Sequence, residues 1–324
     1  MITGSSDIPV EIHRNNIMDR VDLRTTHEEA DVIIPRQVVQ AIEEGAVCVR
    51  VICDHTDVFV LLLHVYLTMN LTCTVLMEST SADRTIVDIG ATTQKNKAII
   101  PSLLAAHALS GCDTVARLTG IGKIKVIKQL EKGLHLDHLG VKDASFDLVL
   151  SEATSFIAAC YGRYNKASMS DVRYEVWLSK LGKKNIRNMP KLQALPPTTE
   201  SFLENVKRAH LQTCIWKATL EQDPPTFNVL EFGWKKEVVG KVLSPVLIAD
   251  DKPLAPASVL KLVSCGCSSD QPCGTARCRC YSAHLPCTMF CSCHQTCNCA
   301  NRLTKEADTN SDSEAEDCDS NDET

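Results

Sequence analysis

The sequence predicts a protein of the α/β class: a parallel sheet with helices, followed by a helical region and a small cysteine-rich module. Three observations lead to this expectation. Strand-like and helix-like segments alternate over residues 27–135, which is typical of an α/β layer with a mostly parallel sheet. Helical sequence punctuated by aromatic residues follows it. Ten of the 17 cysteines then fall between positions 265 and 299.

Hydrophobic patterning and capping signals place the individual elements. A helix is expected over residues 27–45, because acidic residues occupy its first turn and Gly45 ends it. The run AVCVRVIC at residues 46–53 is expected as a buried strand, whereas residues 58–67 fit either a strand or a helix. Further elements are short strands at residues 73–77 and 85–89 and helices at residues 99–109 and 124–132.

Shifts in composition divide the chain into six parts. In the helical region, aromatic residues recur without any chemical motif, so they are expected to serve packing. In chain order, the parts are an N-terminal remnant (1–26), the α/β core (27–135), the helical region (136–249), a linker (250–262), the cysteine-rich module (263–304) and a disordered acidic tail (305–324).

The net charge of −6 is unevenly distributed. Residues 305–324 carry nine acidic side chains and one lysine, a charge of −8, so the rest of the chain carries +2. A nearly neutral body is compatible with nucleic-acid binding without arguing for it. The longest apolar run, residues 58–65, is too short to span a bilayer, and no signal peptide is recognised. A reducing intracellular location without membrane association is therefore expected.

The cysteine-rich module needs crosslinks, because almost no apolar residue lies between its cysteines to form a core. Four cysteine pairs have the spacing C-x-C, and two thiolates two residues apart can bind one metal ion or bridge two. Zinc therefore fits the pattern better than disulfides, which are the alternative. His284 and His294 are substitute ligands to consider. The expected zinc ligands are Cys265, Cys267, Cys273, Cys278, Cys280, Cys287, Cys291, Cys293, Cys297 and Cys299.

Three groups of acidic residues are candidates for a second kind of metal site. Glu29 and Asp31 lie near a helix start, Asp54 and Asp57 follow a strand, and Asp113 follows the next helix. Phosphodiester cleavage by two Mg²⁺ or Mn²⁺ ions needs several carboxylates, because these hard cations prefer oxygen ligands. Judged on spacing alone, such acids are more often helix caps and solvated turns.

The order of the motifs favours the metal site. Glu29-Ala-Asp31 comes first, a strand followed by Thr56-Asp57 comes second, and SGCDTVARLTGIGK at residues 110–123 comes last. This order resembles the flap-endonuclease branch of PIN-like nucleases over roughly residues 27–131. The resemblance implies metal-binding carboxylates at Glu29, Asp31, Asp57 and Asp113, and hence a Mg²⁺- or Mn²⁺-dependent endonuclease.

The same resemblance implies a loop that binds the phosphates of duplex DNA at residues 120–123. Gly120 and Gly122 let the backbone approach a phosphate, and amides at the start of the next helix supply positive potential. Lys123 and Lys125 add positive charge.

Two departures from the family favour the alternative, a non-catalytic DNA-binding or interaction protein that keeps the nuclease fold. His55 stands where the family has the first aspartate of its D-x-D motif, with Asp54 as a neighbouring substitute. Residues 1–26 hold nothing that resembles the family's N-terminal strand, so the nuclease core is expected to be truncated at its N-terminus or completed by a partner polypeptide. Residues 146–234 resemble a segment of uncharacterised, transposon-related animal proteins.

The cysteine spacing resembles one tesmin-type CXC repeat, in which nine cysteines hold three zinc ions and the module docks on DNA. This chain has ten cysteines, and Cys297 is the expected spare because Cys299-Ala-Asn301 matches the family's closing C-x-N. Arg277 replaces the family's tyrosine and Tyr281 follows it, and both are expected to contact DNA. The resemblance implies a nuclear protein. A purely structural or protein-binding zinc module is the alternative.

Overall fold

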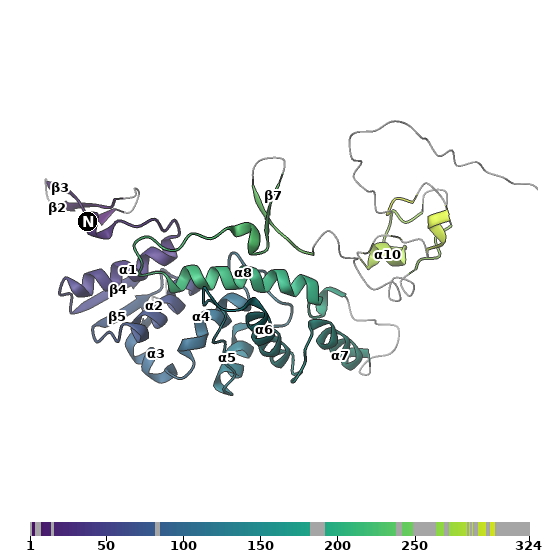
Figure 1. Cartoon of the computed structure of the whole chain (residues 1–324), viewed down its shortest axis with the longest axis horizontal. Helices are drawn as coiled ribbons and strands as arrows, with labels where there is room; N and C mark the ends of the chain where they lie inside the picture. The colour runs from purple at the N-terminus through teal and green to yellow at the C-terminus, as the bar shows by residue number, and fades with distance from the viewer. Residues whose placement is uncertain are drawn as a thin grey trace, which may run out of the picture. The chain divides into compact units, whose positions relative to one another are not determined.

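The chain divides into two compact units, Met1–Ala249 and Asp250–Thr324. Helices and strands both occur in the larger unit (Figure 1), so the predicted mixed α/β class is confirmed. No described helix is both long enough and apolar enough to cross a membrane. The computed structural model describes residues 2–3, 8–13, 16–81, 85–181, 192–237, 242–248, 264–268, 272–283, 285, 287, 291–295 and 299–301.

The central sheet has the strand order β4-β5-β6, formed by Cys48–Ile52, Thr74–Glu78 and Ile86–Asp88. β4 and β5 are parallel, whereas β5 and β6 are antiparallel. A parallel pair needs a long crossover, which the helix between β4 and β5 supplies, while the short link to β6 permits only an antiparallel return. The sheet is therefore mixed, and the mostly parallel, PIN-like sheet of the sequence prediction is not confirmed.

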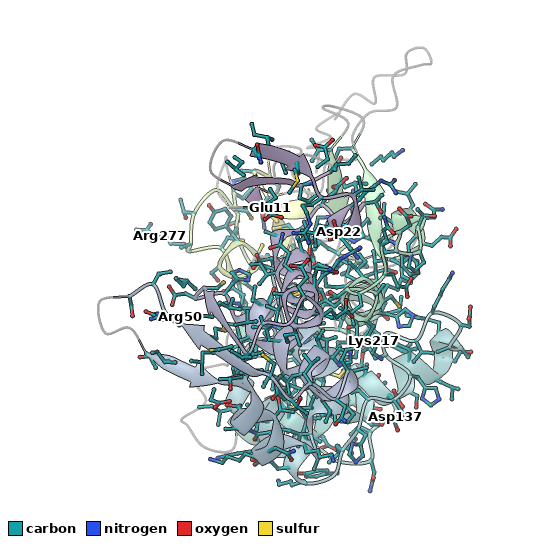
Figure 2. The ribbon with its side chains drawn as sticks, turned by 90° about the vertical axis from the view of Figure 1, so that its left-hand side faces the viewer. Glu11, Asp22, Arg50, Asp137, Lys217 and Arg277 are labelled. Carbon is teal, nitrogen blue, oxygen red and sulfur yellow. The ribbon has the colours of Figure 1, made fainter. Side chains whose placement is uncertain are left out.

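Three helices accompany the sheet: α1 (Ala30–Glu43), α2 (Thr56–Thr68) and α3 (Ile89–Asn96). Residues 58–67, which fitted either a strand or a helix, belong to α2. Its apolar side chains pack with Val51 and Val75 from the sheet. On β4, the alternate residues Cys48, Arg50 and Ile52 are exposed, as Figure 2 shows for Arg50, so only one face of this strand is buried.

The helical region and the α/β part share one hydrophobic core. α8 packs along α4, and Leu104 of α4 belongs to the same buried cluster as Phe202 and Trp216 of α8. This arrangement brings side chains from the helical region to the α/β part. The helices are α4 (Ile100–Leu109), α5 (Lys123–Glu131), α6 (Phe146–Cys160), α7 (Met169–Leu181) and α8 (Thr199–Lys217).

The first 26 residues, expected as a remnant, contain a small antiparallel sheet. Its strands are β1 (Ile2–Thr3), β2 (Val10–His13) and β3 (Asn16–Asp19). Arg20 forms ion pairs with Glu11, Asp22 and Glu44, and so links this sheet to the end of α1. The remaining elements of the larger unit are the antiparallel pair β7 (Trp234–Lys236) and β8 (Leu243–Pro245) and the 3₁₀ helices Val21–Leu23, Leu192–Ala194 and Val229–Glu231.

Candidate metal centres

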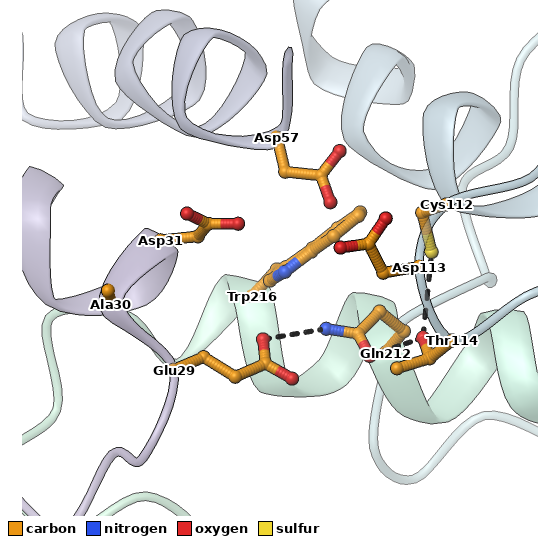
Figure 3. Close-up of a pocket in the computed structure, with 9 residues that line it drawn as sticks. All are labelled: Glu29, Ala30, Asp31, Asp57, Cys112, Asp113, Thr114, Gln212 and Trp216. Carbon is orange, nitrogen blue, oxygen red and sulfur yellow. Dashed lines mark hydrogen bonds between the residues drawn. The ribbon is translucent and has the colours of Figure 1, made fainter. Parts of the chain in front are cut away.

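Four acidic side chains from separate segments line one pocket of the larger unit. Glu29 is the N-cap of α1 and Asp31 lies in its first turn, Asp57 lies in the first turn of α2, and Asp113 follows α4. The pocket has a volume of about 240 Å³, and Figure 3 shows the four carboxyl groups facing a common space. The residues that line it are Glu29, Ala30, Asp31, Asp57, Cys112, Asp113, Thr114, Gln212 and Trp216.

His55 lies among these carboxylates. Its Nδ1 is 2.7 Å from Oδ2 of Asp31 and its Nε2 is 3.6 Å from Oδ2 of Asp113. One ligand atom from each of Asp31, His55 and Asp57 lies within 4.8 Å of the other two. These three side chains can therefore reach one metal ion, with a nitrogen ligand where the family resemblance implies an oxygen ligand.

A buried histidine fixes the orientation of Asp57. Nε2 of His107 lies 2.6 Å from Oδ1 of Asp57, and both side chains are buried. Burial raises the pKa of Asp57, but the hydrogen bond from His107 and the positive charges of His107, His55 and Lys123 outweigh it and lower the pKa overall. Asp57 is thus held as a carboxylate.

On the other side of the pocket, the negative charges of Glu29 and Asp31 are less well compensated. Desolvation raises the pKa of Glu29 although its side chain retains solvent contact, and the nearby carboxylates raise it further against a hydrogen bond from Gln212. Desolvation likewise raises the pKa of Asp31, with His55 opposing and the carboxylates of Asp57 and Asp113 adding to it. Bringing these acids together is electrostatically unfavourable, and a cation would reverse this cost.

Asp54 does not join this group, contrary to the prediction that it substitutes for the aspartate replaced by His55. Its carboxylate accepts hydrogen bonds from the backbone N–H and the hydroxyl of Thr80. A hydrogen bond from the side chain of Ser79, together with those from Thr80, lowers the pKa of Asp54. Asp54 and His55 point in different directions because successive residues of extended backbone alternate in facing.

The loop at residues 120–123 also differs from the prediction. It does connect α4 to α5, and Gly120 has φ +77°, a conformation that favours glycine. However, the ammonium group of Lys123 donates to His107 O, Ser110 Oγ and Gly111 O at 2.7–2.9 Å. Burial lowers the pKa of Lys123 to about 8. This side chain caps the end of α4 instead of reaching toward a phosphate, and Lys125 donates to Gly120 O.

The sequence did not indicate Gln212 and Trp216, which line the pocket, or His107, which contacts Asp57. Gln212 donates to Glu29 and accepts from Thr114, and the indole ring of Trp216 is tilted by 31° against the ring of His107, with centroids 5.7 Å apart. Gln212 and Trp216 lie on α8, in the region assigned to packing alone. Gln212 is one of several polar side chains that α8 buries, so nothing in the sequence singled it out.

In the smaller unit, nine of the ten expected cysteine ligands are described, and they cluster. Neighbouring sulfurs lie 3.4–4.0 Å apart, for example 3.4 Å between Cys265 and Cys293. None of these nine cysteines forms a disulfide. Three overlapping sets of four can each hold a metal ion: Cys265, Cys267, Cys273 and Cys278; Cys265, Cys278, Cys280 and Cys287; and Cys265, Cys273, Cys287 and Cys293.

The described helical segments of this unit are short and lie among the cysteines. Cys278 caps α10 (Arg279–Ser282) by accepting from Tyr281 N, and a 3₁₀ helix spans Ser292–Gln295. The side chain of Asn301 donates to Leu285 O and to Cys287 Sγ, which gives a structural role to the closing C-x-N. Arg277 and Tyr281, the expected DNA contacts, are both exposed. Cys297 and the side chains of His284 and His294 lie outside the described residues.

No family model matches the chain, and no curated protein or solved structure is significantly similar to it.

Proposed function

We propose that this chain is a metal-dependent phosphodiesterase of the flap-endonuclease type that acts on DNA and carries a separate zinc-binding module. The observation that carries the proposal is the meeting of Glu29, Asp31, Asp57 and Asp113 in one pocket. Acidic residues that only cap helices or lie in solvated turns would not be expected to converge from three segments of the chain. Like charges at such short range are unfavourable unless cations lie between them.

The donor set fits divalent cations such as Mg²⁺ or Mn²⁺. The pocket offers carboxylate oxygens, and the imidazole of His55 lies with Asp31 and Asp57 where the three could share one ion. Asp31, His55 and Asp57 would hold one ion, and Glu29 with Asp113 a second. When bound, such ions activate water and stabilise the leaving oxygen of a phosphodiester.

Residues in and around the pocket keep the acids in place. His107 donates to Asp57 and keeps it ionised and correctly oriented. Gln212 donates to Glu29 and is itself held by the hydroxyl of Thr114. Lys123 secures the end of α4 just before Asp113 by its three hydrogen bonds.

For the cysteine-rich module we propose zinc as the metal. Three tetrahedral ions need twelve ligand positions, which nine thiolates supply only if three of them bridge. The overlap of the three cysteine sets, with Cys265 common to all, supports such sharing. Arg277 and Tyr281 are exposed and suit contacts with DNA. A nuclear location would follow from this DNA-binding role.

The second candidate function is non-catalytic DNA binding, and the position of His55 in place of a carboxylate favours it. Both candidate functions are compatible with a protein partner that completes the sheet. Among the strands that the structure describes, β4 is at the edge of its sheet, so a strand from another polypeptide can extend the sheet there.

A cleavage assay on 5′-flap DNA with Mg²⁺ or Mn²⁺ separates these candidates. The test variant is Asp57→Asn, which keeps the shape of the side chain but removes its charge. The matched control is Asp54→Asn, because Asp54 is an exposed neighbour outside the pocket. We expect cleavage to fall by about 100-fold or more in the first variant and to stay within about twofold in the second. DNA binding without cleavage by the wild-type protein would select the non-catalytic function.

A further inference from the structure

We propose that the site formed by Asp31, His55 and Asp57 binds a first-row transition-metal ion such as Mn²⁺ through the imidazole of His55, in preference to Mg²⁺. This inference rests on the proposed function, because it concerns the same pocket. It goes further by naming a nitrogen ligand and the class of cation that this ligand selects.

The first step is the position of the imidazole. His55 is the N-cap of α2, two residues before Asp57, so its side chain starts at the edge of the pocket. Its Nδ1 lies 2.7 Å from Asp31 Oδ2, yet this contact lacks hydrogen-bond geometry. With ligand atoms of Asp31, His55 and Asp57 within 4.8 Å of one another, the ring is placed to share a cation with both carboxylates.

The second step is the chemistry of this donor set. Mg²⁺ prefers an octahedron of oxygen ligands and keeps several of its waters, whereas imidazole suits first-row transition metals. Mn²⁺ accepts carboxylate and imidazole together, and affinity for such mixed sites rises from Mn²⁺ toward Co²⁺. One nitrogen between two carboxylates therefore shifts the preference of the site away from Mg²⁺.

The third step is an independent observation at the same pocket. Trp216 lines it and is only 2% exposed, yet its indole N–H has no acceptor among the described residues. A buried donor without an acceptor costs about 1–3 kcal/mol. Figure 3 shows the indole ring among the carboxylates, where an oxygen carried by a bound ion would supply the acceptor. His107 fixes Asp57 in the way that outer-shell partners orient metal ligands.

Pulsed electron paramagnetic resonance of Mn²⁺ bound to the full-length, zinc-loaded chain tests this inference. Zinc on the thiolates keeps Mn²⁺ out of the cysteine-rich module. We expect nitrogen modulation from a directly bound imidazole in the wild-type protein and its loss in His55→Asp. The matched control is His138→Asp, because His138 also pairs with a carboxylate, at 2.6 Å from Glu152, and is 44% exposed against 43% for His55. Nitrogen modulation should persist in this control.

Calorimetric titrations with Mn²⁺ and Mg²⁺ give a second readout. We expect the wild-type protein to prefer Mn²⁺ by at least about tenfold, and His55→Asp to lose most of this preference. Mn²⁺ that binds the wild-type protein without nitrogen modulation would overturn the inference. This result does not depend on whether any variant folds. Asp57-dependent cleavage in that case would leave the proposed function standing. Nitrogen modulation without any cleavage would contradict the enzymatic function and support the nitrogen-ligated site.

Discussion

Replacing His107 by leucine should destabilise the larger unit, because it leaves a buried carboxylate without its hydrogen-bond donor. His107 and Asp57 are 4% and 8% exposed, and their contact is 2.6 Å long. Breaking a buried pair by removing one partner costs about 3–5 kcal/mol. His55 and Lys123 still offset part of the charge of Asp57, so we expect about 3 kcal/mol. In a unit of this size the melting temperature should fall by about 6–12 °C.

The destabilisation should depend on pH. In the wild-type protein the folded-state pKa of Asp57 is lowered below its ordinary value. Its contribution to stability is therefore present above the unfolded-state pKa and is lost as pH falls through the folded-state pKa. In His107→Leu, burial without the donor should raise the folded-state pKa, so the variant should lose stability as pH rises above about 4. The deficit of the variant should widen between about pH 4 and pH 7.

Thermal unfolding followed by circular dichroism at about pH 4.5, 5.5 and 7 measures this deficit. His107→Gln is the matched control, because its amide retains an N–H donor near Asp57, and it should lose only about 1 kcal/mol. A leucine variant as stable as the glutamine variant, or a deficit that is constant with pH, would refute the assigned interaction.

Two other outcomes are expected. Lys123→Met should lower the free energy of unfolding in urea by about 2–3 kcal/mol, because three acceptors lose a charged donor, whereas Lys125→Met should cost less than about 1 kcal/mol. Equal effects would place both ammonium groups in solvent. Metal analysis of the zinc-saturated chain should give about three zinc ions, and chelation should unfold the smaller unit while the larger unit keeps its unfolding transition. Two zinc ions per chain would indicate separate four-cysteine sites.

Local signals in the sequence predicted most of the elements. The helix expected at residues 27–45 is α1, and the helix expected at residues 99–109 is α4. Residues 58–67 were ambiguous because a short, uniformly apolar run suits a buried strand and a buried helix alike. The reversal at β6 was missed because apolar patterning carries no information on strand direction.

The candidate site was predictable only where its residues share local motifs. The order of the acidic motifs indicated Glu29, Asp31, Asp57 and Asp113. His107 and Trp216 gave no such signal, because neither belongs to a recognisable motif and Trp216 is brought to the pocket only by the packing of α8 on α4.

Lys123 was misassigned for a related reason. The sequence Gly-Ile-Gly-Lys at residues 120–123 suggests a loop that binds phosphate, and nothing local shows that carbonyl groups at the end of α4 lie beside its ammonium group. Such carbonyls lack partners within their own helix and attract a cation.

The most direct measurement is the anomalous scattering of Mn²⁺ in crystals of the zinc-loaded protein. We expect a peak between Asp31, His55 and Asp57, with ligand atoms at about 2.0–2.5 Å. At a Mn²⁺ concentration that saturates the protein in solution, a pocket without any peak would contradict a metal-dependent site at these residues.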